Sequence, residues 1–238
     1  MRIVSWNCCQ GFDGKVGAML ALNPEVLVVP ESCQRPQIAM SSLFNRAVPH
    51  LWDGVLPNKG LGVFAPGADE LKLIAPESGG SGSIGIAGGA CHGAVNTTVV
   101  GVWTVPGTVG RNPYLAAAAG IVDRYQKTLG SGNAVVAGDF NVSGRTDRAG
   151  MVAFGRMMKE RFGLVSAYHA HAGVEIGDER GGTLWWRGKL ADAYHCDFVF
   201  VPAAWRIRRV EIGSYEQWGA PGVVARSDHA PVIVDVER

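Results

Sequence analysis

Residues 135–141, Val-Val-Ala-Gly-Asp-Phe-Asn, place a carboxylate and an amide directly after a short apolar run. Residues 135–137 are typical of a buried strand, and Gly138 allows the backbone to bend and to approach another group closely. If the strand continues, Asp139 and Asn141 share one face while Phe140 points into the core. Such a pair can order and activate a water molecule. It is equally compatible with a turn that ends a strand, because Asp and Asn favour turns.

The length and composition indicate one ordered domain. The chain has 238 residues, of which 47% are hydrophobic and 18% charged, enough for a large core. Its five cysteines are an odd number without a C-x-x-C pair, which favours a reducing compartment over a disulfide framework. A strand pattern begins at Met1, and no apolar run approaches membrane-spanning length. We therefore expect a single cytoplasmic domain over residues 1–238, without a membrane span, and nothing indicates a protein partner.

The charge balance limits how the chain can bind phosphate. Nucleic-acid binders are often strongly basic, whereas the formal net charge here is +1. Any phosphate-binding surface must therefore be local, or it must borrow positive charge from a metal ion. The sequence contains no G-x-x-x-x-G-K-[ST] segment, which excludes a phosphate loop of that kind.

Strand patterns dominate the chain, and helical patterns are fewer. The predicted strands are 3–6, 25–29, 60–65, 70–74, 95–105, 135–137, 196–201, 205–212 and 232–236. The predicted helices are 16–22, 35–44, 113–129 and 151–162. The third begins at a proline and has Gly130 beyond its end, the usual punctuation of a helix. Many strands with interspersed helices predict an α/β fold in which two sheets pack face to face with helices outside.

Polar residues recur at the ends of the apolar strands. They are Asn7, Glu31, Asp139 with Asn141, Asp197, and Asp228 with His229. A carboxylate buried without a partner is costly, so several of them at strand ends imply a shared cation or mutual hydrogen bonds. A surface turn explains any one of these positions better, but five together favour a common site. Oxygen donors point to a hard ion such as Mg²⁺ or Mn²⁺ and not to zinc.

Short motifs at these positions follow one another in a fixed order. They are Ser5-Trp6-Asn7, Pro30-Glu31, Gly138-Asp139-Phe140-Asn141, Cys196-Asp197-Phe198 and Ser227-Asp228-His229. In this order, over residues 2–236, they resemble the endonuclease/exonuclease/phosphatase superfamily. The resemblance implies a DNase I-like, four-layer α/β/β/α sandwich of two mostly antiparallel sheets flanked by helices. It also implies a divalent-metal phosphoester hydrolase site at one edge of the two sheets.

The resemblance assigns the metal to three residues. It makes Glu31 the main ligand, with Asn7 and Asp228 completing or supporting the shell. The implied ion is Mg²⁺, with Mn²⁺ as a possible substitute. A cation at this place would stabilise the negative charge that grows on the non-bridging phosphate oxygens during attack.

The resemblance assigns the proton chemistry to four further residues. It implies that Asp139 orients and deprotonates the attacking water, while Asn141 holds the water or a phosphate oxygen. It places His229 against the phosphate, with Asp197 fixing the tautomer of the imidazole through its other nitrogen.

The segment between these motifs narrows the resemblance to one branch. Residues 102–107, Val-Trp-Thr-Val-Pro-Gly, lack the histidine that sphingomyelinase-like and inositol phosphatase-like members carry here. They are nearer to the exonuclease III and abasic endonuclease branch, in which a Val-Pro turn precedes a phosphate-contacting tyrosine. Tyr114 fits that position. The segment 183–186, Thr-Leu-Trp-Trp, resembles one that lines the substrate pocket of that branch, which implicates Trp185.

This chain departs from that branch at several positions. Gly107 replaces the usual asparagine of the turn, and Pro30 replaces the usual glutamine before the metal-binding glutamate. The residues that would shape an abasic pocket, Leu184, Tyr194 and Cys196, also differ from the usual ones. Specificity for abasic sites therefore does not follow from the resemblance.

Three functions fit these observations to different degrees. The first is a metal-dependent nuclease, endonuclease or exonuclease, which hydrolyses DNA or RNA by activated-water attack. The second is a phosphatase or phosphodiesterase of a small phosphoester, such as an inositol phosphate, a nucleotide or a phospholipid headgroup. The near-neutral charge favours it, because a small substrate needs no long basic track. A non-enzymatic module would lack a catalytic residue, and none is missing.

Overall fold

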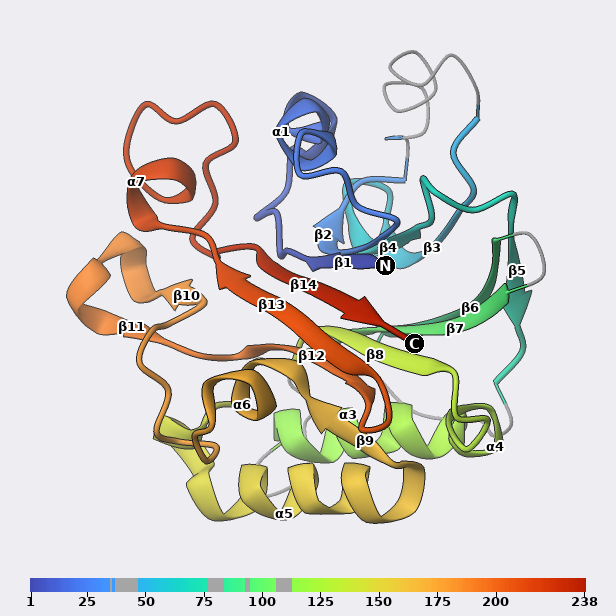
Figure 1. Ribbon diagram of the computed structural model, residues 1–238. Coiled ribbons are helices and arrows are strands. Elements are labelled where there is room, and N and C mark those ends of the chain that lie inside the picture. Colours follow the sequence, from blue (N-terminus) through green and yellow to red (C-terminus); the bar gives the residue numbers. More distant parts are fainter. Residues whose placement is uncertain (35, 37–46, 77–83, 93–94, 106–112) are drawn as a thin grey trace.

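Two six-stranded sheets form the framework of the chain (Figure 1). The computed structural model describes residues 1–238 except 35, 37–46, 77–83, 93–94 and 106–112. The first sheet has the order β13 (Arg206–Ile212), β14 (Val232–Glu237), β1 (Arg2–Ser5), β2 (Val26–Ser32), β4 (Lys59–Phe64), β3 (His50–Leu56). The second has the order β5 (Glu70–Ile74), β6 (Ile84–His92), β7 (Val95–Trp103), β8 (Ala134–Asp139), β12 (Asp197–Pro202), β9 (Leu164–Ser166).

Each sheet contains one parallel pair, and its other neighbours are antiparallel. The parallel pairs are β1 with β2 and β7 with β8. Alternate side chains of these strands face two different cores. Ile3, Val26 and Val135 belong to the core between the sheets, whereas Val4 and Val136 belong to the outer cores. The central strands are therefore buried on both faces, as the continuous apolar run at 25–29 predicts.

Helices cover the outer face of each sheet (Figure 1). On the second sheet lie α3 (Pro113–Arg124), α4 (Gln126–Leu129) and α5 (Gly144–Phe162). Phe154 of α5 packs edge-to-face against Phe140, which follows β8. On the first lie η1 (Phe12–Gly14), α1 (Val16–Leu20) and α7 (Tyr215–Trp218). The four-layer DNase I-like sandwich is confirmed.

Short elements complete the chain between β9 and β12. They are α6 (Ala167–Ala172), β10 (Leu184–Trp185), η2 (Trp186–Gly188), η3 (Leu190–Asp192) and β11 (Ala193–Tyr194). β10 and β11 pair with each other as a separate two-stranded sheet. In the part of the chain that the structure describes, no helix has the length and apolar composition needed to cross a membrane.

The structure departs from the predicted bounds of two helices. The helix predicted over 113–129 is interrupted at Tyr125, whose φ and ψ are −120° and 22°. The one predicted over 151–162 begins earlier, at Gly144, because Ser143 and Thr146 form a reciprocal capping box. The one predicted over 35–44 lies, except for Pro36, outside the described residues. Strand β3 had no counterpart among the predicted elements.

Candidate active site

One edge of the two sheets receives all the polar strand ends that the sequence singles out. β1, β2 and β8 end there, while the antiparallel β12 and β14 begin there. The register pairs Asp197 with Asp139 directly and Ser5 with Val232. The topology therefore brings Asn7, Asp139 and His229 together although they are far apart in the sequence.

The Asp139 carboxylate is held by three N–H donors. Its Oδ2 accepts hydrogen bonds from the side-chain amides of Asn7 and Asn141, both at 2.9 Å. Its Oδ1 accepts from the backbone N–H of Asn141, also at 2.9 Å. The two side chains meet as predicted, but not through a continuing strand. β8 ends at Asp139, and Asn141 adopts a left-handed φ of 50°, so a turn brings its amide back onto the carboxylate.

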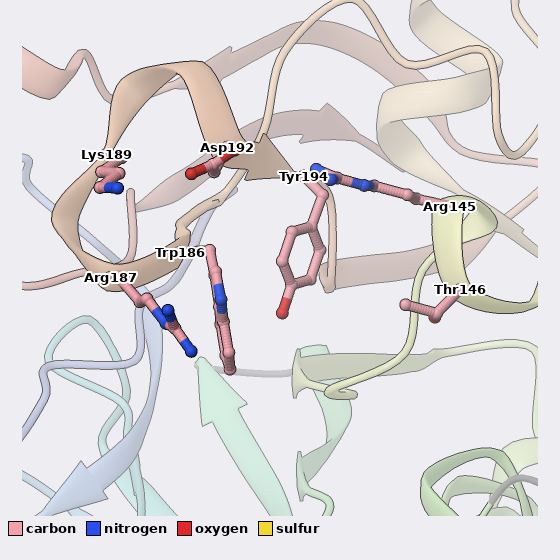
Figure 2. A pocket seen from close by; sticks show the side chains of 7 residues that line it. All are labelled: Arg145, Thr146, Trp186, Arg187, Lys189, Asp192 and Tyr194. Atoms are coloured by element: carbon pink, nitrogen blue, oxygen red, sulfur yellow. The ribbon is translucent and has the colours of Figure 1, made fainter.

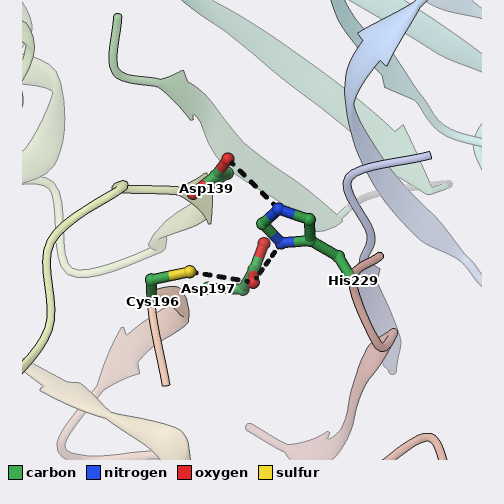
Figure 3. Close-up of side chains that lie close together, drawn as sticks. All are labelled: Asp139, Cys196, Asp197 and His229. Carbon is green, nitrogen blue, oxygen red and sulfur yellow. Dashed lines mark hydrogen bonds and ion pairs between the residues drawn. The ribbon is translucent and has the colours of Figure 1, made fainter. Parts of the chain in front are cut away.

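The His229 imidazole lies between two buried carboxylates (Figure 3). Its Nδ1 is 2.8 Å from Asp197 Oδ2, and its Nε2 is 4.0 Å from Asp139 Oδ2. The His229 carbonyl accepts the indole N–H of Trp6 at 2.9 Å, and its N–H donates to the Ser227 hydroxyl at 3.0 Å. These bonds fix the backbone on either side of the ring, so the ring has little freedom to turn away.

A threonine and a serine support this arrangement, although sequence reasoning assigned them no role. Thr183 Oγ1 accepts the backbone N–H groups of Cys196 and Asp197, both at 3.0 Å. The Ser227 hydroxyl donates to the Asn7 carbonyl at 2.7 Å. Both residues stand inside the motifs that carried the resemblance, so position could have indicated them, but their partners depend on the fold.

The pKa values of Asp139 and His229 are both raised, but for different reasons. Burial and then the neighbouring charge of Asp197 raise the pKa of Asp139 to about 7. Burial lowers the pKa of His229, but the carboxylates of Asp197 and Asp139 outweigh it and raise that pKa to about 10. At neutral pH the site therefore pairs a cationic imidazole with a carboxylate near its titration midpoint. Burial also raises the pKa of Cys196, which keeps its thiol protonated.

Glu31, the predicted main metal ligand, projects from a β-bulge. The pairing of β2 with β4 shifts between Pro30 and Ser32, and Glu31 between them has a left-handed φ of 60°. Its carboxylate Oε2 lies 3.2 Å from Lys59 Nζ. Among the described residues, no hydrogen bond joins Glu31 to Asn7 or Asp228. Sequence reasoning did not find Lys59, because no motif contains it.

The donors at this edge suit a divalent cation. Oxygen atoms of Asn7, Glu31 and Asp228 are the type that hard ions prefer. In addition, Asp139, Cys196, Asp197 and His229 each offer one ligand atom, and these atoms lie within 4.8 Å of one another. Asp197 Oδ1 is buried and has no hydrogen-bond partner in the described chain, which leaves an uncompensated buried oxygen beside the site.

Two neighbouring cavities, together called the groove, lie beside this edge. One cavity of about 390 Å³ is lined by Asp228, Trp185 and Arg187, among others. Arg187 also lines a second cavity of about 540 Å³ (Figure 2), so the two cavities are neighbours. The residues around the second cavity are Arg145, Thr146, Trp186, Arg187, Lys189, Asp192 and Tyr194. The cationic side chains are thus gathered next to the candidate site.

The predicted substrate-binding residues Trp185 and Tyr114 differ in how deeply their side chains are buried. Trp185 is 2% exposed and packs edge-on against Tyr215 at 5.2 Å, so its ring belongs to the outer core of the first sheet. Its neighbour Trp186 is 50% exposed and presents its ring to the groove. Tyr114 is half-buried at the start of α3, where it packs against the outer core of the second sheet.

Comparison with known proteins identifies the fold. No family model and no curated protein matches the chain. Solved structures match over its whole length. A 3′ phosphatase from Neisseria, bound to product DNA hairpin, has 18% identity, a TM-score of 0.74 and 100% coverage of both chains. An AP endonuclease from Archaeoglobus fulgidus has 14% identity, a TM-score of 0.73 and the same coverage.

An endonuclease/exonuclease/phosphatase from Bacteroides vulgatus has 17% identity and a TM-score of 0.71, covering 99% of this chain and 98% of that one. At these identities the similarity lies in the arrangement of the elements. The chain has the DNase I-like fold of the endonuclease/exonuclease/phosphatase superfamily.

Proposed function

We propose that the protein is a divalent-metal-dependent phosphodiesterase that cleaves nucleic acid by attack of an activated water. The observation that carries this proposal is the pairing of two groups at the sheet edge. One is the Asp139 carboxylate, oriented by three N–H donors, and the other is the His229 imidazolium, held by Asp197. The two groups are 4.0 Å apart, so the base can accept a proton from the attacking water while the cation stabilises the charge on the phosphate.

The residues divide the work by their positions. Asp139 accepts a proton from the water, and the Asn141 amide orients the water or a phosphate oxygen. His229 donates from Nε2 to a non-bridging oxygen, where negative charge grows during attack. Asp197 is a positioning residue that keeps the proton on Nδ1. Tyr114 is assigned a contact to the phosphate from the start of α3.

The metal is assigned to Glu31, Asn7 and Asp228. Bound there, Mg²⁺ or Mn²⁺ would neutralise charge on the phosphate and the leaving oxygen. The bulge displaces Glu31 from the β2–β4 ladder near the end of β2, at the edge where β1 and β8 also end. The buried amide of Asn7 joins this group to Asp139 through a 2.9 Å hydrogen bond.

The groove favours a nucleic-acid polymer over a small phosphoester. Among the described residues, Arg145, Arg187 and Lys189 line the cavity of Figure 2 and form no ion pair, so their charge is available to phosphates. The exposed Trp186 offers a flat apolar face on which an unpaired base can stack. The DNA hairpin bound by the Neisseria phosphatase is consistent with such a substrate.

The test is a cleavage assay with Mn²⁺ or Mg²⁺ on plasmid, single-stranded DNA, RNA and abasic duplex. Bis-p-nitrophenyl phosphate and a panel of small phosphate esters serve as the competing substrates. Asp139→Asn should lower turnover by about 10²- to 10⁴-fold, the usual contribution of a general base, and should leave the circular dichroism unchanged. Retained activity would refute the role of Asp139. Turnover of small esters alone would favour the second function, and no metal-dependent turnover at all would refute the proposal.

A further inference from the structure

Lys59 lies between the proposed metal ligand Glu31 and the end of the second sheet. Its Nζ is 3.2 Å from Glu31 Oε2 and 5.5 Å from the centroid of the Trp103 ring. The Glu31 side chain is 18% exposed and that of Lys59 35%. For comparison, the surface pair of Lys72 and Glu70 is 68% and 53% exposed. The Lys59 ammonium is thus better shielded from water, which strengthens its attraction to the carboxylate.

Strand pairing holds Glu31 and Lys59 next to each other. Ser32 pairs with Gly60 and Pro30 with Leu61, so the bulged Glu31 faces the start of β4. Lys59 is the first residue of β4 and pairs with Leu56 across the hairpin, which tethers it next to that bulge. On the other side, Trp103 is 6% exposed and stands opposite Asp139 in the β7–β8 register. The aromatic face further stabilises an ammonium at this place.

We propose that Lys59 is a tethered cation that competes with the divalent metal for Glu31. The inference rests on the proposed function, in which Glu31 is the main metal ligand. The Glu31 carboxylate would then face two cations, the metal ion and the Lys59 ammonium. The ammonium, at 3.2 Å, offsets the negative charge that would attract the metal. A metal ion that takes Glu31 therefore either displaces Nζ or bears its repulsion. Lys59 keeps the strained, partly buried Glu31 compensated without metal and makes metal binding weaker and more readily reversed.

The experiment measures Mn²⁺ binding to the full chain by titration calorimetry, in the absence of any substrate. Lys59→Met keeps the length of the stem and removes the charge, and it should tighten the dissociation constant about two- to fivefold, the scale of a partly exposed ion pair. Lys59→Arg should stay close to wild type. Lys72→Met is the matched control, because it breaks a lysine–glutamate pair on β5 and should leave Mn²⁺ affinity unchanged.

Equal or weaker Mn²⁺ binding by folded Lys59→Met, with wild type binding normally, would overturn the inference and leave the proposed function standing. If that variant does not fold, Lys59→Gln replaces it, and the rise of the melting temperature with added Mn²⁺ is compared with wild type. A larger rise in the variant supports competition, and an equal rise refutes it. If no variant and no wild-type protein binds Mn²⁺, the metal site itself is refuted, and the inference with it.

Discussion

Asp197→Asn tests the proposed chemistry most directly, because it removes one charge and little else. The asparagine has nearly the same volume, and its amide oxygen can still accept the His229 Nδ1–H bond, which is 2.8 Å long in the structure. The backbone N–H of residue 197 still donates to Thr183. What disappears is a fully buried negative charge that acts on both His229 and Asp139.

The size of the effect follows from the pKa values of these two groups. Two unit charges 4 Å apart interact by about 4 kcal/mol at an effective dielectric constant of 20, which corresponds to about three pKa units. Loss of the Asp197 charge should therefore return the pKa of His229 from about 10 most of the way to its ordinary 6.5. The pKa of Asp139, raised to about 7 first by burial and then by the charge of Asp197, should fall as well when that charge is removed.

The assay is the pH dependence of kcat/KM. In the wild type, activity should rise with pH as Asp139 ionises near pH 7 and should fall as His229 loses its proton near pH 10. In Asp197→Asn both limbs should move to lower pH, and the maximum should drop by about 10²- to 10⁴-fold. An unchanged circular dichroism spectrum and a cooperative thermal transition control for folding. A variant that loses activity while its alkaline limb stays in place would refute the idea that Asp197 holds the proton on His229.

Two further variants test the groove and the close approach of β8 to β7. Trp186→Ala should weaken binding of single-stranded oligonucleotides by about 1–3 kcal/mol in fluorescence anisotropy while hydrolysis of bis-p-nitrophenyl phosphate stays unchanged; an equal loss on both substrates would contradict a stacking role. Gly138→Ala should lower the free energy of unfolding in urea by about 3 kcal/mol or more, because φ is 147° and the new Cβ would lie 1.8 Å from the Val102 carbonyl oxygen. In the matched control, Gly120→Ala in α3, the new Cβ meets nothing within 4 Å, so the free energy of unfolding should rise by about 0.5–1 kcal/mol. Equal stabilities of the two variants would show that the close approach of β7 does not require Gly138.

The sheets and the position of the site could be predicted because both depend on local pattern. Apolar runs such as 135–137 are buried on both faces wherever two sheets and outer helices enclose them. Parallel strands end, and antiparallel strands begin, at the same edge. Asp139, the last residue of β8, and His229, shortly before β14, therefore lie at the same edge of the two packed sheets. This is why Asp139 and His229 lie 4.0 Å apart as the motif order implies.

Contacts that depend on backbone irregularities or distant partners could not be predicted. The bulge at Glu31 arises from the pairing of β2 with β4. Pro30 in a central strand is compatible with a bulge, because it cannot donate to the ladder, but it does not determine that Glu31 is the displaced residue. Lys59 reaches Glu31 only because the β3–β4 hairpin brings it there. Periodicity also did not tell the buried Trp185 from the exposed Trp186, since the two-residue strand β10 ends between them.

The near-neutral net charge of the chain does not argue against a polymeric substrate when the positions of the charged side chains are considered. Exposed charges act over about 8–10 Å in physiological salt, so a phosphate in the groove responds to the residues that line it and hardly to the total. Many cations elsewhere are neutralised in place: Arg2 by Asp235, Arg148 by Asp178 and Arg161 by Asp123. The cavity of Figure 2 instead has three cationic side chains and one acidic residue, Asp192, in its lining. A formal net charge of +1 is therefore compatible with a cavity whose own lining is positive, so the total charge does not decide between a polymeric and a small substrate.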